Sequence, residues 1–227
     1  MKTTALSRLY EHLTFEINVL NSYIDRVEND ISQGIVLYKD NINVIHEEEF
    51  EENNQCFYHE ISECEGLDSD TYNFEGVFEE LFPRLQRGSA LITLCNFFEH
   101  SLKNLCNDLQ SEYYLEDELN CNRIGVIESA IKYLRIDVGL EINTNTSNYS
   151  NIKNIQNIRN SFVHHDGQIT KKVKSFVQQN EYLSGDSKIN IAYGFLIYVL
   201  RNYKDFFQTI YDALNVQYSA SDGKLMR

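Results

Sequence analysis

The sequence has one proline in 227 residues and only 10 glycines. Proteins usually contain about 5% proline, and a proline inside a helix removes a hydrogen-bond donor and clashes with the preceding turn. The scarcity of proline therefore favours long helices and argues against a sandwich or barrel with many glycine and proline turns. Hydrophobic residues make up 42% and charged residues 24% of the chain, which is the composition of a folded globular protein.

The chain also lacks a long apolar run. Residues 1–20 alternate polar with apolar residues and contain no continuous apolar segment of the kind found in a secretory signal. The longest apolar run, 192–200, has about half the length of a membrane span. Five cysteines form an odd set with no pair two residues apart, which fits neither a disulfide framework nor a zinc ribbon. We therefore expect a cytoplasmic protein with free thiols and no membrane segment.

Acidic residues are concentrated in the first part of the chain, and the net charge is −14. Residues 1–90 hold 19 acidic and 6 basic residues, whereas residues 91–227 hold 15 and 14. Residues 123–204 carry 11 basic and 6 acidic residues. This modestly basic stretch can bind a polyanion, while the acidic remainder of the surface keeps the protein soluble. An ordinary solvated surface explains the same asymmetry equally well.

Apolar residues three or four positions apart predict a series of helices. We expect helices over residues 6–32, 35–65, 85–110, 124–135, about 151–165 and 190–214. Ser150 or Asn151 can cap the fifth of these, which stops at Asp166 and Gly167. Residues 169–177 and 182–189 are expected to form a short hairpin or an irregular excursion before the last helix.

This pattern predicts an all-α fold, a helical bundle. We expect an acidic N-terminal helical part over 1–84 that packs on the bundle, a helical domain over 85–214 and a polar tail over 215–227. Cys95 and Cys106 fall in the apolar stripe of the central helix, so we interpret them as small buried hydrophobic residues.

Polar groups gather at the end of one apolar helix, where residues 158–167 read IRNSFVHHDG. At about 100° per residue, Asn160 and His164 lie about 40° apart and share a face, and the long Arg159 side chain can reach the same rim. An always-charged guanidinium, an amide and an imidazole suit a phosphodiester. Simpler roles also fit: Arg159 pairs with a carboxylate, Asn160 bonds a loop, and a histidine caps the helix carbonyls.

The stretch RNSFVHHDG resembles the signature of the HEPN (higher eukaryotes and prokaryotes nucleotide-binding) superfamily. That signature has an arginine, a polar residue and, four to six positions after the arginine, a histidine near a helix end. The order of helices agrees, with LCNFFEHSLKNLC in the central helix and FFQTI in the closing one. The resemblance covers residues 85–214.

The resemblance implies a metal-independent endoribonuclease of a toxin–antitoxin or phage-defence system that acts as a homodimer with the two motifs facing each other. Carried over, Arg159, Asn160 and His164 are the catalytic set, and His165 is the alternative occupant of the histidine position. The expected reaction needs no cofactor or metal: the RNA 2′-hydroxyl attacks the adjacent phosphorus, with histidine moving the proton and arginine neutralising the developing charge. RNA and an antitoxin or associated defence protein are the expected partners.

Other candidate sites carry less weight. Lys171, Lys172 and Lys174 follow the motif closely and can contact RNA phosphates, although an ordinary exposed loop explains them as well. Cys56, His59 and Cys64 offer only three metal ligands at irregular spacing. No glycine-rich phosphate loop is present.

Two further hypotheses remain open beside the nuclease. The chain can be a non-catalytic HEPN-like bundle that dimerises and binds a partner or nucleotide, which the overall negative charge favours. It can also be an immunity-type or scaffold protein whose acidic first part occupies a basic partner.

Overall fold

Long amphipathic helices carry most of the fold. The computed structural model describes residues 4–52, 55–116, 119–121 and 125–220, with side chains for all of these except 47–52, 55–59 and 220. The chain divides into a larger unit, formed by residues 1–24 and 90–227, and a smaller unit, formed by residues 25–89.

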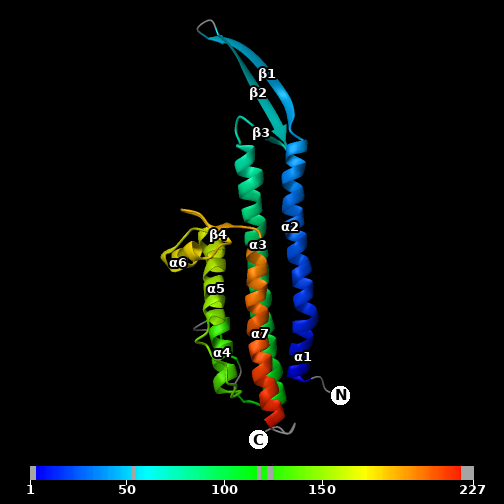
Figure 1. Ribbon diagram of the computed structural model, residues 1–227, viewed down its shortest axis with the longest axis vertical. Helices are drawn as coiled ribbons and strands as arrows, with labels where there is room; N and C mark the ends of the chain where they lie inside the picture. Colours follow the sequence, from blue (N-terminus) through cyan, green and yellow to red (C-terminus); the bar gives the residue numbers. More distant parts are fainter. Residues whose placement is uncertain (1–3, 53–54, 117–118, 122–124, 221–227) are drawn as a thin grey trace. The chain divides into compact units, whose positions relative to one another are not determined.

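The larger unit is mostly helical (Figure 1). Its helical segments are α1 (Ala5–Glu11), the π-helical turn η1 (His12–Glu16), the first turns of α2 (Ile17–Asp40), most of α3 (Phe82–Tyr113), α4 (Val126–Ile136), α5 (Ser147–His165), α6 (Lys171–Gln179) and α7 (Phe195–Ala220). Between α6 and α7 in the chain, β4 (Leu183–Ser184) pairs antiparallel with β5 (Asn190–Ile191). A largely helical fold is thus confirmed, with a small sheet added to it.

The core of the larger unit joins α3, α5 and α7. The predicted apolar stripe of α3 is buried along its length: Leu91, Leu94, Cys95, Phe98, Leu102, Leu105, Cys106 and Leu109. Phe98 stacks on Tyr203 of α7 with ring centroids 3.9 Å apart, and Phe207 meets it edge-on at 5.2 Å. Burial of a phenylalanine side chain contributes about 1.5–3 kcal/mol, so these ring contacts hold α3 and α7 together.

The smaller unit has a core of its own, built around a hairpin. It contains the rest of α2, the strands β1 (Asn43–Glu52), β2 (Gln55–Cys64) and β3 (Leu67–Asp68), the π-helical η2 (Glu75–Leu81) and the start of α3. The strands pair antiparallel in the order β1-β2-β3. Tyr38, Cys64 and Phe78 are buried together, with the two rings stacked 4.7 Å apart.

The predicted helix over 35–65 is wrong, because α2 ends at Asp40 and the following residues form a hairpin. The Asn41 side chain donates to the Leu37 carbonyl at 2.7 Å, which satisfies one of the free carbonyls at the helix end. Cys64, at the end of β2, is buried against Tyr38 and Phe78. Packing of the hairpin base against α2 and η2 overrides the helix propensity of the glutamate-rich run.

The first and last predicted helices both extend beyond their expected ends. The first helix was expected to end near residue 32, but α2 continues through Gly34 to Asp40. At the other end of the chain, α7 begins at Phe195 and continues to Ala220, so residues 215–220 of the predicted tail are helical. The rest of that tail, 221–227, lies outside the described residues.

Two local predictions around the motif helix also need correction. The N-cap of α5 is Thr146, whose Oγ1 accepts the Tyr149 amide at 3.2 Å, and neither Ser150 nor Asn151 caps it. Residues 171–179, expected in a hairpin or excursion, form α6, whose Val173 and Val177 are buried. Only the two-residue strands β4 and β5 form a hairpin there.

The unit boundaries differ from the expected ones. Residues 1–24, which we assigned to an N-terminal part ending at residue 84, belong to the larger unit together with 90–227. The hydrogen bond from the Ala5 amide to Glu112 Oε2, at 2.7 Å, shows why: the start of the chain is tied to α3.

Candidate functional site

The motif lies at the C-terminal end of α5, as predicted, and Ser161 organises that end. Ser161 is buried, and its carbonyl accepts the amides of both Asp166 and Gly167. Its hydroxyl donates to the Gln168 carbonyl at 2.7 Å. Asp166 has φ 50° and Gly167 has φ 72°, so two successive left-handed residues turn the chain away from the helix.

The segment before β5 secures this turn from the other side. The Ile169 amide donates to the Ser187 carbonyl, and the Ile189 amide donates to the Gly167 carbonyl, each at 2.8 Å. Lys188 forms an ion pair with Asp166. The helix end that carries the two histidines is therefore held by main-chain bonds on both sides.

Arg159 is held by two asparagine oxygens. Its Nη1 donates to Asn160 Oδ1 at 3.0 Å, and its Nη2 donates to Asn96 Oδ1 on α3 at 2.7 Å. Its Nε is buried without a hydrogen-bond partner among the described residues. Within that same part of the chain, no carboxylate forms an ion pair with Arg159, so its charge is oriented by neutral groups without being neutralised.

Sequence reasoning missed Asn96, which belongs to a polar seam between α3 and α5. One turn further along α3, Glu99 Oε1 accepts from Gln156 Nε2 of α5 at 3.4 Å. Asn96 and Glu99 are three residues apart and share the polar edge of an otherwise apolar helix. Glu99, a charged residue at the edge of the apolar stripe of α3, was the signal in the sequence that could have pointed to this seam.

His164 and His165 are both exposed in the last turn of α5. Their ring centroids are 6.4 Å apart. Asn160 and His164, which we expected to share a face, form no side-chain hydrogen bond with each other among the described residues, and Asn160 Oδ1 accepts from Arg159. The structure thus brings Arg159 and Asn160 together and leaves both imidazoles open to solvent.

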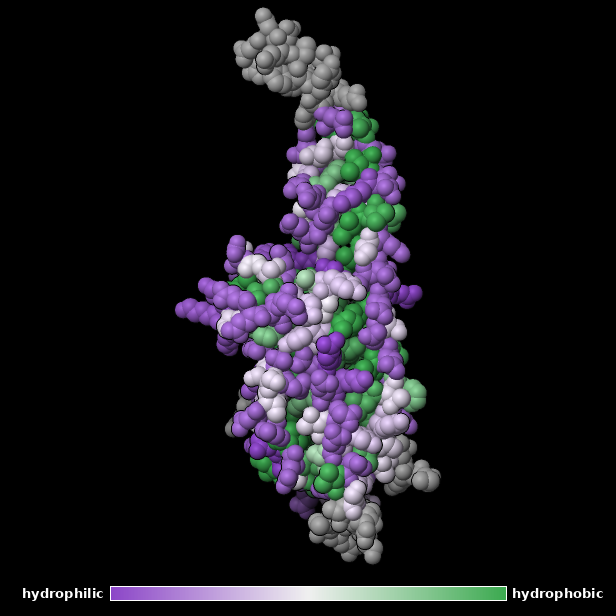
Figure 2. Space-filling model, in the orientation of Figure 1, coloured by the Kyte–Doolittle hydropathy of each residue, from purple (hydrophilic) through white to green (hydrophobic). Residues whose placement is uncertain are grey.

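The three lysines of the predicted RNA-binding cluster lie on α6. Lys171, Lys172 and Lys174 are exposed, on the side of α6 away from the buried Val173 and Val177. The space-filling view shows hydrophilic side chains gathered over the projecting α6 segment (Figure 2). The alternative of an exposed loop is wrong about the secondary structure, because residues 171–179 form a regular helix. The three lysines are nevertheless exposed, as that alternative also expected.

The cysteines of α3 are confirmed as buried, and Cys95 lies directly before Asn96 in the chain. Burial raises the pKa of Cys95 to about 12, and it accepts the Tyr203 hydroxyl at 3.1 Å. Burial likewise raises the pKa of Cys106 to about 12. Burial of both side chains disfavours the thiolate, which is the nucleophilic form of cysteine.

Within the described residues, no group of three or more histidine, cysteine, aspartate or glutamate side chains is placed to hold a metal ion. Cys56, His59 and Cys64 were the possible metal ligands in the sequence. The side chains of Cys56 and His59 lie outside the described part, and Cys64 is buried in the smaller unit. Over the same described residues, no helix is both long and apolar enough to cross a membrane.

Comparisons with known proteins found no matching family model, no matching curated protein and no matching solved structure.

Proposed function

We propose that the end of α5 is the active site of a metal-independent endoribonuclease of the HEPN type. The observation that carries this proposal is the Arg159 guanidinium, which Asn96 and Asn160 orient while no described carboxylate neutralises it. A fixed, uncompensated positive charge stabilises the charge that develops on phosphoryl oxygens in the transition state. Among the described residues these two asparagine contacts stand where the simpler alternative expected a carboxylate partner for Arg159.

The exposed histidines supply the proton transfers of the proposed reaction. The RNA 2′-hydroxyl attacks its own phosphorus, one imidazole accepts the hydroxyl proton, and a second protonates the departing 5′-oxygen. The products are a 2′,3′-cyclic phosphate and a 5′-hydroxyl. One motif does not place His164 against Arg159, so a second copy of the chain, related by two-fold symmetry, completes the site.

RNA reaches this site over α6. Lys171, Lys172 and Lys174 form a short basic face on the segment that follows the motif, and phosphates are held there by charge alone. An antitoxin-like or defence-associated protein that covers the helix end would keep the enzyme inactive.

The test is cleavage of a labelled single-stranded RNA in EDTA. The wild-type protein cuts it, the His164→Ala variant loses activity, and the matched His100→Ala variant, which removes an exposed histidine of α3, keeps it. A DNA of the same sequence survives because it lacks the nucleophile. His165→Ala keeps activity if His164 is the catalytic histidine; loss of cleavage in His165→Ala with retention in His164→Ala would assign the role to His165.

The second candidate is a non-catalytic dimeric module of the same type, favoured by the exposed histidines, whose side chains form no hydrogen bond with Arg159 or Asn160 in the described part of the chain. If a confirmed dimer binds RNA without cutting it, and His164→Ala leaves binding unchanged, this second function replaces the first.

A further inference from the structure

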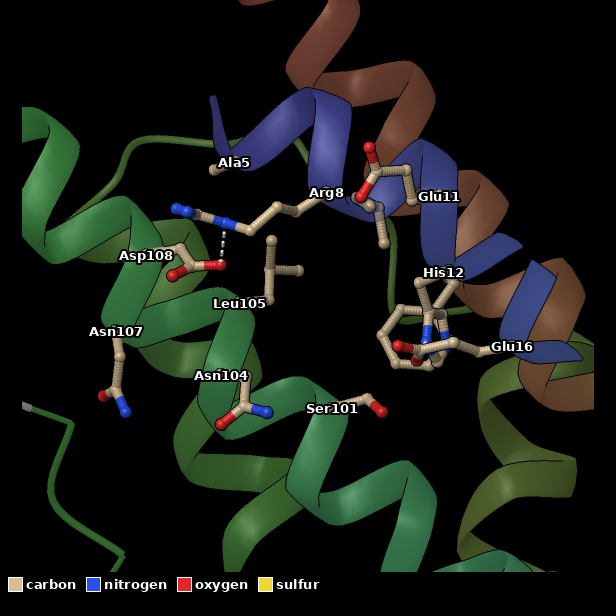
Figure 3. A pocket seen from close by; sticks show the side chains of 12 residues that line it. Ala5, Arg8, Glu11, His12, Glu16, Ser101, Asn104, Leu105, Asn107 and Asp108 are labelled. Atoms are coloured by element: carbon tan, nitrogen blue, oxygen red, sulfur yellow. Dashed lines mark hydrogen bonds and ion pairs between the residues drawn. The ribbon is translucent and has the colours of Figure 1, made fainter. Parts of the chain in front are cut away.

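Two cavities of the larger unit differ in the partners of their polar groups. The first, of about 490 Å³, lies between α1, η1 and α3, and it is lined by two charged pairs: Arg8 with Asp108 at 2.5 Å, and His12 with Glu16 (Figure 3). The second, of about 390 Å³, lies where the end of α6 meets α5 and α7. Its volume falls within the range of small-molecule sites, about 300–1,000 Å³.

Three aromatic side chains line the second cavity. Tyr198, in the first turns of α7, lies beside Phe176 and Tyr182, with ring centroids 6.5 Å and 6.1 Å away. All three residues are half-buried, so part of each side chain remains open to solvent. Aromatic side chains placed in this way bind planar heterocycles by stacking.

The backbone around Tyr182 holds this side chain in place. The Tyr182 amide donates to Asn180 Oδ1 at 3.0 Å, and its carbonyl accepts the Ala192 amide at 2.9 Å. The ring lies against Gly194, where a Cβ would come within 2.9 Å of Tyr182 Cε1. The wall is therefore formed before a ligand binds, which lowers the cost of ordering it.

Uncharged amides make up most of the polar lining. Asn151 and Asn154 lie three residues apart on one face of α5, and Gln179 and Asn180 end α6. Asn151 donates through Nδ2 to Asn202 at 3.1 Å, which leaves its Oδ1 without a partner among the described residues. Asn154 and Gln179 make no side-chain hydrogen bond within that same part of the chain. Such amides offer a donor beside an acceptor, the groups that recognise the edge of a nucleobase.

Basic side chains lie outside this cavity. Among the described lining residues, Glu181 alone is charged, so the cavity itself does not suit a phosphate. Lys172 is exposed and lies one turn before Phe176 on the same face of α6. This arrangement suits a nucleotide whose base enters the cavity while its phosphate contacts the lysine.

We propose that this cavity binds one nucleobase of the single-stranded RNA substrate. The base stacks on Phe176, and Asn154 and Gln179 form hydrogen bonds with its edge. His165 lies on the same face of α5 as Asn154, about 16 Å further along the helix axis. The assignment rests on the proposed function, and it makes the cavity a determinant of which RNA sequence is cut.

The experiment measures binding of a labelled single-stranded DNA by fluorescence anisotropy at constant ionic strength, because DNA carries bases and phosphates but lacks the nucleophile. DNA with all four bases binds more tightly than an abasic DNA of equal length and charge, by about fivefold or more. Phe176→Leu, which keeps an apolar side chain, removes this difference and leaves binding of the abasic DNA unchanged.

Two neighbouring glutamines of α6 form a matched pair for the hydrogen bonds. Gln179→Ala weakens binding of the base-containing DNA, whereas Gln178→Ala, which alters an exposed glutamine outside this cavity, does not. Circular dichroism of each variant shows an unchanged helix content, so the loss reports the contact and not the fold.

Equal binding of the abasic and the base-containing DNA by wild type would overturn the proposal, as would equal losses in Gln179→Ala and Gln178→Ala or an undiminished difference in Phe176→Leu. RNA cleavage without base-dependent binding would overturn this site and keep the nuclease. Base-dependent binding without RNA cleavage would keep the nucleobase site and overturn the nuclease.

Discussion

The two units of the chain differ most in charge. Residues 25–89 contain 17 acidic and 4 basic residues, whereas the rest of the chain contains 17 and 16. The net charge of −14 therefore belongs almost entirely to the smaller unit, and the rest of the chain is close to neutral. The cores differ as well, since the smaller unit packs around Tyr38, Cys64 and Phe78 and the larger one around a long aromatic and aliphatic seam.

The largest expected effect concerns the two cores. Phe98→Ala removes the ring stacked on Tyr203 and lowers the free energy of unfolding by about 3–5 kcal/mol, measured by guanidinium denaturation. Phe78→Ala, in the smaller unit, speeds amide hydrogen exchange within residues 25–89 and leaves α5 and α7 protected. Loss of protection in α7 in the Phe78 variant would show that the two cores are not independent.

The second prediction compares the free energy of unfolding lost when a buried ion pair and an exposed ion pair of the smaller unit are broken. Arg87 Nε donates to Glu28 Oε1 at 3.0 Å, and its Nη2 lies 2.6 Å from Oε2, with both side chains largely buried. Arg87→Ala leaves a buried carboxylate uncompensated and costs about 3–5 kcal/mol. Lys39→Ala, which breaks the exposed pair with Glu79, costs less than about 1 kcal/mol. Equal midpoints in urea for the two variants would contradict this ranking.

A smaller expected effect, on the salt dependence of RNA binding, tests whether the proposed enzyme binds RNA through the α6 lysines. Replacing Lys171, Lys172 and Lys174 by alanine lowers the slope of log K against log salt by up to about 2, since each single-strand phosphate contact contributes about 0.7. Lys39→Ala, in the acidic unit, leaves the slope unchanged. A slope that responds to Lys39 and not to the α6 lysines would place RNA on the smaller unit. Filter binding at several salt concentrations measures this slope.

The smallest effect is a pH dependence confined to the smaller unit. The hydrogen bonds from Lys39 and from the Tyr38 hydroxyl hold the pKa of Glu79 below its ordinary 4.5. A lowered pKa stabilises the fold above that value, and the contribution is lost as the pH falls through the folded pKa. The urea midpoint of the wild type should therefore fall more between neutral pH and a pH below 4.5 than the midpoint of Glu79→Gln does, because the variant has no carboxylate to protonate. A Glu79→Gln profile identical to wild type would refute the assignment.

The sequence predicted the parts of the fold that depend on local periodicity. The buried stripes of α3 and α7 follow from apolar residues three and four apart, and the end of α5 follows from Asp166 and Gly167. The hairpin could not be predicted in this way, because glutamate favours helices and the packing of Cys64 on Tyr38 decides the outcome. Propensity cannot express such tertiary contacts.

In the candidate site, too, local sequence predicts some features and tertiary packing decides the others. The position of the motif at a helix end was predictable from the residues that surround it. The contact of Arg159 with Asn96 joins residues 63 apart in the chain, so only the packing of α3 on α5 could reveal it. Helical spacing places Asn160 and His164 on one face, but it could not show that Asn160 Oδ1 accepts a hydrogen bond from Arg159.

Cleavage of a labelled RNA in EDTA by wild type, Arg159→Ala and Arg159→Lys tests the central claim most directly. Wild type yields a 2′,3′-cyclic phosphate product, Arg159→Ala loses about 100-fold or more of the activity, and Arg159→Lys keeps partial activity, because lysine keeps the charge but not both bonds to Asn96 and Asn160. Undiminished cleavage by Arg159→Ala would show that the Arg159 guanidinium is not part of the active site.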